Sequence, residues 1–414
     1  MIARGDGLGL TSILHPTGNS NVRMAARALF DVGNLDQLVT SIGRPKSRPF
    51  PPGLPEALKR ELRKRSYELP SDNIRQRRRE EIFRNVLLHS PSRQARRLAE
   101  PWSPFGVNWV ARKIDQSFAH SMPGRAGLQA VMGYQGTSVA SFRQAKALGL
   151  ARVLEITHAH WRTTELIYDR SAERDPEWNS TIARPNSAGR EEADEQISLA
   201  TIVLSPSRQV TDSLRAVNPQ LPIIFNPYGC PPVQSDVRVR SWDGSAPLRA
   251  LFVGRLTAGK GIAALAAAVE MVGNAMELTI VGARPNAESP ALDRLIQQSR
   301  YLGTLPHGEV LAEMRKAHVF VLPSLVEGRS LAALEAMSSG LPMIVSPGSG
   351  VDDLVEEGAG QVVPNGDAMA LVHAIQEILT DRALVQGYSE RAIAIAAANG
   401  WDGYRRVIQQ LSLP

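Results

Sequence analysis

The sequence is poor in cysteine and has no long hydrophobic run. Its single cysteine, Cys230, excludes internal disulfides and any metal site built from cysteines, and we expect a packed thiol rather than a reactive one. No run of about 18 apolar residues is present to span a bilayer, and the opening MIARGDGLGL has little of the apolar content of a signal peptide. These absences predict a cytoplasmic protein, either free or peripheral on the inner face of the membrane.

Motifs of three other protein classes are also missing. No Asp-x-Asp pair is present to hold a divalent metal on a diphosphate. A P-loop requires Ser or Thr after its lysine, whereas Gly261 follows Lys260 in GRLTAGKG. No G-x-G-x-x-G opens a turn between a strand and a helix, which disfavours a nicotinamide-dependent oxidoreductase.

The length of 414 residues exceeds the usual size of one hydrophobic core, so two domains are expected. Strands and helices alternate at short intervals from about residue 248 and, less cleanly, before residue 230, which predicts an α/β protein with parallel sheets. A Pro-, Gly- and Ser-rich stretch separates the two patterns. We predict one domain over residues 1–230, a second over 231–399, and a helix in 400–414 that packs back on the first.

Positive charge is concentrated in residues 43–113. This segment holds 18 Lys and Arg against 7 Asp and Glu, a net charge of +11, whereas the rest of the chain has a net charge of −5. It reads as a basic helical insertion that meets an anionic membrane or a phosphorylated acceptor, or else as a plain solvated face. Nucleic acid is not expected, because no helix-turn-helix, zinc-finger or aromatic RNA-binding signature accompanies the charge.

Two cations follow the predicted strand that ends at Val253. Arg255 and Lys260 lie in a glycine-containing loop that begins at Gly254, and both side chains are suited to a diphosphate. Taken alone, the loop favours a surface turn that carries ordinary solvated cations over a diphosphate site.

A pair of carboxylates brackets the start of a short predicted helix. Glu327 lies in the loop after the strand AHVFVLP, at the end of a parallel strand where ligands bind in such sheets. The helix begins at Ser330 and Leu331, whose N–H groups can meet a phosphate. Glu335 lies one turn later, where it can accept hydrogen bonds from a ribose. The alternative is that both glutamates are ordinary surface residues.

The order GRL-x3-KG, VLPS-x2-EG-x6-EAM-x2-G-x-P, DLVEEG and VVPNGD resembles the retaining glycosyltransferases of family 4. The resemblance is strong over residues 248–379, weaker over 196–229 and faint over the first 190. It implies the GT-B fold, with two Rossmann-like domains facing each other across a cleft. Where the commoner pattern is EGFGLP, this chain has EGRSLA, which leaves the identity of the sugar open at Arg329 and Ser330.

The resemblance also implies roles for individual residues in binding a nucleoside-diphosphate sugar. The donor diphosphate would contact Arg255 and Lys260 next to Gly254, Glu327 would contact the sugar, and Glu335 would contact the ribose. The backbone of Arg329, Ser330 and Leu331 would contact the phosphates and the sugar. The base would lie near Gly303 to Leu305, and Gly18 would lie across the cleft near the phosphate or the acceptor.

Two histidines end a predicted strand of the first domain, within ITHAHW. At least one of His158 and His160 is expected in the active site, with a structural role as the alternative. A metal site is less favoured, because no third ligand has matching spacing. Of the two, His158 is assigned to catalysis, whereas His160, Trp161 and Arg162 are placed on the acceptor side.

These features together predict a retaining, metal-independent glycosyltransferase with no cofactor besides its nucleotide-sugar substrate. It would transfer the sugar to an acceptor hydroxyl, such as that of a lipid-linked glycan, in cell-surface polysaccharide or glycolipid assembly. The alternatives are a non-catalytic carbohydrate- or nucleotide-binding module and a GT-B sugar-nucleotide epimerase.

Overall fold

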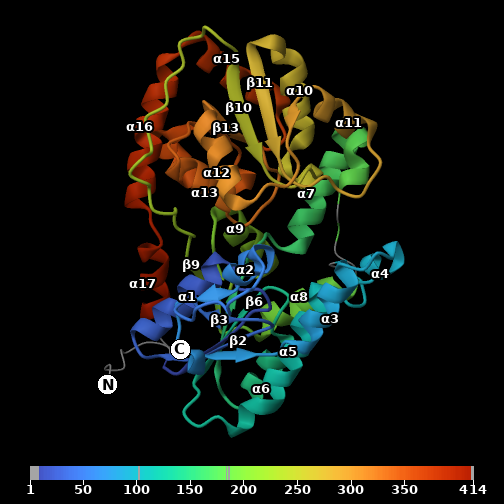
Figure 1. The fold of residues 1–414 in the computed structure, drawn as a ribbon, viewed down its shortest axis with the longest axis vertical. Coiled ribbons are helices and arrows are strands. Elements are labelled where there is room, and N and C mark those ends of the chain that lie inside the picture. Colours follow the sequence, from blue (N-terminus) through green and yellow to red (C-terminus); the bar gives the residue numbers. More distant parts are fainter. Residues whose placement is uncertain (1–8, 101–102, 183, 185–186, 412–414) are drawn as a thin grey trace.

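The computed structural model describes residues 9–100, 103–182, 184 and 187–411, which form two α/β domains one above the other in Figure 1. The sheet of the first domain has seven parallel strands in the order β5-β2-β1-β6-β7-β8-β9. The strands are β1 Thr11–Leu14, β2 Leu35–Thr40, β5 Ile74–Gln76, β6 Ala130–Tyr134, β7 Ala151–Glu155, β8 Ile202–Ser205 and β9 Ile223–Phe225.

Both faces of this sheet are covered by helices, because alternate residues of each strand point to opposite faces. On β1, Ile13 packs in one core with Val22, whereas Leu14 packs in another with Phe118. The helices of this domain are α1 Ser20–Asp31, α5 Val107–Ser121, α6 Val139–Ala147, α7 Trp161–Arg174, α8 Ser187–Leu199 and α9 Arg208–Val217.

The sheet of the second domain has six parallel strands in the order β12-β11-β10-β13-β14-β15. Its strands are β10 Leu248–Val253, β11 Met276–Val281, β12 Arg300–Tyr301, β13 Val319–Leu322, β14 Met343–Val345 and β15 Gly360–Val362. Its helices are α10 Ile262–Val272, α11 Pro290–Gln297, α12 His307–Lys316, α13 Leu331–Ser338, α14 Asp352–Leu354, α15 Ala368–Thr380 and α16 Ala383–Ala398.

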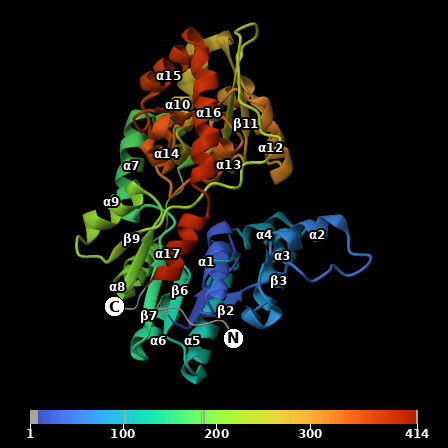
Figure 2. The same cartoon turned by 90° about the vertical axis from the view of Figure 1, so that its left-hand side faces the viewer.

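The basic segment 43–113 contains more than the helices that were predicted for it. Strand β5 pairs with β2 at the edge of the main sheet, so part of the segment belongs to the domain core rather than to an insertion. The remainder projects to one side of the first domain in Figure 2. It consists of the paired strands β3 Arg44–Pro45 and β4 Ser66–Tyr67, with helices α2 Glu56–Arg63, α3 Arg79–Leu88 and α4 Arg93–Arg97.

The chain passes between the domains twice. It first crosses after β9 and returns after α16, and the last helix, α17 Asp402–Gln410, lies beside α1 of the first domain (Figure 2). Tyr404 of α17 and Tyr228 of the first crossing both donate hydrogen bonds to the buried carboxyl group of Glu155, over 2.5 and 2.9 Å. Asn21 of α1 donates to the same carboxyl group over 2.6 Å. Burial raises the pKa of Glu155.

Candidate active site between the domains

Lys260 and Glu327 form an ion pair at the carboxyl ends of the neighbouring strands β10 and β13. The Ser324 hydroxyl donates a 2.6 Å hydrogen bond to Glu327 and fixes the second oxygen of its carboxylate. Both charged side chains are largely buried, with 23% of Lys260 and 13% of Glu327 exposed. The pair is therefore preorganised, and a ligand that reaches it meets both charges at once.

The two loops that carry this pair are fastened to each other by their backbones. The Leu325 N–H donates to the Gly259 carbonyl over 2.8 Å. Gly261 has a φ of 70°, and a Cβ there would overlap the carbonyl oxygen of Pro323. Glycine is needed at this position for both reasons, since other residues rarely adopt this conformation and none would fit.

Helix α13 begins at Leu331, four residues after Glu327, and its amino end borders a cavity that the loop before α1 also lines. The Ser330 side chain caps this end by accepting from the Ala333 N–H. Leu331, the first helical residue, is exposed. One turn on, Glu335 lies 3.0 Å from Nε2 of His307, and 24% of its side chain is exposed. Glu335 is thus accessible, with a partner that can be displaced by a ligand hydroxyl.

The side chain of Arg329 points away from this surface into the protein. Its guanidinium donates to the carbonyls of Tyr228 and Gly350, over 3.1 and 2.8 Å, and to the Asp353 carboxylate over 2.9 Å. Only 2% of the side chain is exposed. Arg329 therefore positions the loop through its side chain, and a contact of its backbone with the donor stays a prediction.

The remaining residues expected on the donor side lie at the same edge of the second sheet. Arg255 is exposed beyond the end of β10, and the N–H of Gly254 donates to the Val281 carbonyl over 2.9 Å. Gly303 has a φ of 65°, its carbonyl accepts from Gly282, and a Cβ on it would meet only open space. Leu305 is half-buried in the loop before α12.

The first domain closes over this edge through the loop that follows β7. That strand ends at Glu155, earlier than predicted, so His158 lies in a loop. A Cβ on Gly328 would overlap the Thr157 carbonyl oxygen, which shows how closely the two domains approach. Burial lowers the pKa of His158, the nearby Glu327 opposes this effect and Lys260 adds to it. The imidazole is therefore neutral at pH 7.

His158 opens onto a cavity of about 470 Å³ in the first domain. The cavity is lined by aromatic and polar side chains, among them Trp161, Tyr168 and Gln135. Mixed apolar and hydrogen-bonding linings of this kind are typical of small-molecule sites. Helix α7, which supplies two of these residues, extends beside the second domain in both views.

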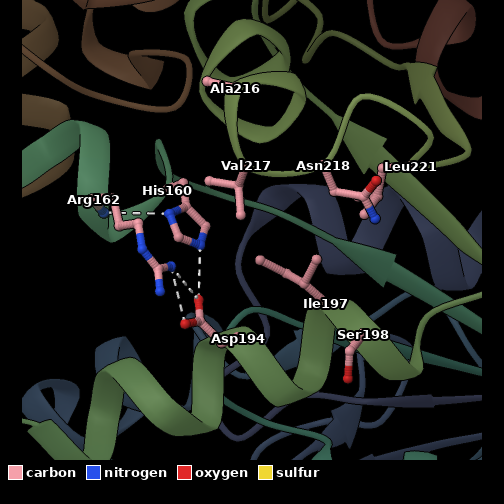
Figure 3. A pocket seen from close by; sticks show the side chains of 9 residues that line it. All are labelled: His160, Arg162, Asp194, Ile197, Ser198, Ala216, Val217, Asn218 and Leu221. Atoms are coloured by element: carbon pink, nitrogen blue, oxygen red, sulfur yellow. Dashed lines mark hydrogen bonds and ion pairs between the residues drawn. The ribbon is translucent and has the colours of Figure 1, made fainter.

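His160 and Arg162 lie in a different cavity, shown in Figure 3, although they were expected on the same side as Trp161. His160 is the N-cap of α7, and this turns its ring toward Asp194 of α8, at 2.9 Å. Arg162 pairs with the same carboxylate over 3.1 Å. The Trp161 indole also donates to Asp194, over 2.8 Å, while its ring lines the cavity of His158.

His15 contributes to the site and was not singled out in the sequence. Its Nδ1 accepts hydrogen bonds from the N–H groups of Thr17 and Gly18, over 3.1 and 2.9 Å. Gly18 has a φ of 69°, and a Cβ there would overlap the Tyr67 hydroxyl. The ring thereby fixes the loop before α1, and burial lowers its pKa to about 4. The only available signal was its place at the end of the strand TSILHP.

Two further findings concern the described residues alone. In the ranges given above, no group of three His, Cys, Asp or Glu could hold a metal ion, and no helix is long and apolar enough to cross a membrane. Cys230 is buried, and burial raises the pKa of its thiol to about 11, in line with a packed side chain.

Comparison with known proteins identifies the second domain. Residues 247–381 match the family glycosyl transferases group 1. This part of the chain is a glycosyl transferases group 1 domain. The chain is similar to the amylovoran biosynthesis glycosyltransferase AmsK of Erwinia amylovora, with 34% identity over 139 residues; the match covers 30% of this chain and 34% of AmsK. The O-antigen chain mannosyltransferase B of Escherichia coli is 28% identical over 204 residues, 47% of this chain and 51% of that one.

The chain thus spans only a third to a half of the length of these curated relatives. Over nearly the whole chain, the similarity is one of fold. The sucrose-phosphate synthase of Thermosynechococcus elongatus superposes with a TM-score of 0.60 at 19% identity and covers 97% of this chain and 98% of its own. The two Rossmann-like domains therefore have the GT-B fold, as the sequence predicted.

Proposed function

We propose that this protein is a retaining glycosyltransferase of family 4 that moves a sugar from a nucleoside diphosphate to an acceptor hydroxyl. The observation that carries the proposal is the buried pair Lys260 and Glu327, held at the amino end of α13 and faced by His158 of the other domain. The glycosyl transferases group 1 domain supports it.

In this reaction, negative charge develops on the departing diphosphate. Lys260, the exposed Arg255 and the N–H groups at the start of α13 supply positive charge that is in place before the reaction begins, the arrangement that stabilises a transition state most effectively. We propose that these groups hold the diphosphate without a metal ion. Glu327 and Glu335 then position the sugar and the ribose.

We do not assign a general base to the protein. His158 is neutral at pH 7 and lies beside Glu327 and Lys260. Its Nδ1–H points to the Ala159 carbonyl over 3.4 Å, so Nε2 can accept a hydrogen bond from a hydroxyl of the sugar or of the acceptor. In a substitution on one face of the sugar, the leaving phosphate accepts the acceptor's proton. The 470 Å³ cavity beside His158 is proposed to take the acceptor.

The donor site is tested by substitution at Lys260. Lys260→Ala removes a cation that would contact the diphosphate, and the loss of one such stabilising group lowers kcat by about 10²–10³-fold. The control is Lys316→Ala, which removes an exposed lysine paired with Glu313 on the far end of α12. Folded Lys260→Ala protein that transfers sugar as fast as the control would disprove the assigned site.

A thermal-shift screen of nucleoside diphosphates and their sugars identifies the donor before an acceptor is known. A ligand present at 100 times its dissociation constant stabilises the protein by about 2.7 kcal/mol. Binding without transfer or hydrolysis would favour a non-catalytic module, whereas inversion at a carbon of the sugar would favour an epimerase.

We further propose a role in assembling a cell-surface polysaccharide or glycolipid, at an anionic membrane. AmsK is named for amylovoran biosynthesis and the E. coli relative for the O-antigen chain. Helix α3 exposes Ile82, Phe83 and Val86 at 53%, 45% and 64%. The exposed cations of the same segment include Arg79 and Arg97. Apolar and basic side chains together are suited to insert among, and attract, anionic lipids.

Vesicle sedimentation tests this surface. Binding to vesicles of anionic phospholipid should weaken with salt and should fall at least tenfold in Val86→Glu, which places a negative charge on the exposed face of α3. The control is Met271→Glu, which changes another exposed apolar residue. Met271 lies on α10 in the other domain and is 51% exposed. Equal binding by both variants would contradict membrane attachment through α3.

A further inference from the structure

The 470 Å³ cavity beside His158 has a lining that is polar but almost uncharged. Among the described residues that line it, none is a lysine or an arginine, and Glu192 of α8 is the only carboxylate. Its two histidines, His15 and His158, have lowered pKa values because both rings are buried, so they are neutral at pH 7. The cavity therefore offers no cation to a phosphate or a carboxylate.

Two arginines lie next to the cavity, but neither lines it and both are paired. Arg190 forms an ion pair with Glu165, and its guanidinium lies 5.3 Å from the centre of the Trp161 ring. Arg112 lies 3.6 Å from Glu192, and 49% of its side chain is exposed. Because exposed pairs of this kind are weak, a ligand in the cavity still meets the negative charge of Glu192.

Amide side chains reach the cavity from three elements. Asn19 precedes α1 and Asn108 lies in the first turn of α5, and neither side chain forms a hydrogen bond within the described part of the chain. Gln135 follows β6, and its side-chain oxygen accepts from the Thr157 N–H over 3.2 Å, which leaves its NH2 group available. The three amides can thus donate hydrogen bonds on different sides of one ligand.

Threonine hydroxyls in the same lining complement these amides. Thr164 donates to the Ala159 carbonyl over 3.3 Å, and Thr157 donates to the side-chain oxygen of Gln135 over 3.4 Å. Both threonine oxygens are therefore left to accept. A hydroxyl group of a ligand both donates and accepts, so the lining is suited to an uncharged molecule that carries several hydroxyl groups.

We propose that this cavity takes an uncharged sugar unit of the acceptor, and that Glu192 rejects acceptors whose corresponding sugar carries a carboxylate or a phosphate. The inference rests on the proposed function, which places the acceptor in this cavity. An anionic sugar would lose its water here without gaining a cation, and it would lie near a like charge. An uncharged sugar would instead exchange its hydrogen bonds to water for bonds to Asn19, Asn108 and Gln135. Charged groups elsewhere on the acceptor would lie outside the cavity.

Matched methyl hexosides test the proposal, each as the neutral sugar, the uronic acid and the 6-phosphate. The gluco, galacto and manno series cover the unknown identity of the sugar. Saturation-transfer NMR measures their binding without a donor, and release of nucleoside diphosphate measures transfer. In the parent, the neutral form should bind about tenfold more tightly than either anionic form, since a like charge at a binding site costs several kcal/mol.

Two pairs of variants assign this preference to the lining. Glu192→Gln should reduce the preference for the neutral form by about fivefold, because it removes the like charge. Its control, Glu191→Gln, changes an exposed neighbour on α8 outside the cavity and should keep the parent preference. Asn108→Leu should weaken binding of the neutral hexoside by about tenfold through lost hydrogen bonds. Gln116→Leu, two turns further along α5 and outside the cavity, should not.

Several results would overturn the proposal. These are equal or tighter binding of an anionic form by the parent, no binding of any hexoside, and the same preference in Glu192→Gln as in Glu191→Gln. A parent protein that neither binds a nucleotide sugar nor transfers from it would instead disprove the proposed function. The NMR measurement needs no donor, so it would still decide which sugars the cavity takes.

Discussion

The buried side chain of His15 fixes the loop before α1, and we expect it to make the stability of the fold depend on pH. Its ring accepts two backbone N–H groups and has a pKa of about 4, against an ordinary value of 6.5. Above pH 6.5 the ring is neutral in both the folded and the unfolded protein. As the pH falls from 6.5 toward 4, the unfolded state takes up the proton first, so the folded state loses stability.

We predict that His15→Asn makes the stability less dependent on pH. The Asn carbonyl oxygen can replace Nδ1 as acceptor but does not titrate. Between pH 6.5 and 4 the parent should lose on the order of 3 kcal/mol more of its unfolding free energy than the variant does. Urea denaturation at both pH values measures this difference. The exposed His120→Asn serves as control, and a parent-like slope in His15→Asn would contradict the role given to His15.

The closeness of Lys260 and Glu327 could be predicted from the sequence, but the direction of several side chains could not. Lys260 and Glu327 follow strands, and strand ends in a parallel sheet meet at one edge. The orientation of Arg329 depends on Tyr228 and Asp353, which are distant in the sequence. Likewise, the separation of His158 from His160 depends on where α7 begins.

At the level of elements, the loop between β13 and α13 is held by the buried pair of Arg329 and Asp353. This anchor lies only two residues from Glu327, so it helps to keep Glu327 beside Lys260, together with the backbone hydrogen bond between Leu325 and Gly259. The pair explains how the chain tolerates an arginine where the commoner pattern has a phenylalanine. The side chain of Arg329 therefore positions the loop and does not contact the sugar.

We predict that Arg329→Ala lowers the unfolding free energy by about 3–5 kcal/mol, since it leaves the Asp353 carboxylate without its partner in a largely buried site. Chemical denaturation measures this loss. In Arg208→Ala, which removes an exposed pair with Glu356, the change should stay below about 1 kcal/mol. Similar stabilities for the two variants would show that the Arg329 pair does not anchor the loop.

The elements that the sequence analysis missed are those with weak local signals. Strand β5 has three residues within a strongly charged segment, and it becomes a strand because β2 offers a free edge. Helix α7 follows directly from a loop that had been read as part of β7. By contrast, the apolar strands of the second domain and its helices follow a regular alternation, and they were predictable from it.

At the scale of the whole molecule, the close approach of the domains depends on a residue without a side chain. Gly328 lies against the Thr157 carbonyl of the other domain, where a methyl group has no room. The contact involves backbone on both sides, so small side-chain adjustments cannot relieve an overlap.

We predict that Gly328→Ala keeps the domains apart. Transfer should fall by at least tenfold, while nucleoside-diphosphate binding, which uses mainly the second domain, should change less. Small-angle scattering should show a larger radius of gyration than in the parent. The control Gly308→Ala, in the first turn of α12, adds a methyl group in open space. Parent-like scattering and activity in Gly328→Ala would refute the requirement for this contact.

The shared hydrogen bonds of Tyr228 and Tyr404 to Glu155 have a consequence for how the domains can move. Both chain crossings are tied to the first domain at the same buried carboxyl group, and the two crossing segments that lead away from it define an axis of rotation. We expect the second domain to swing about that axis rather than to slide or twist across the cleft. Each opening would therefore retrace the same arc and return Lys260 and Glu327 to the same place opposite His158.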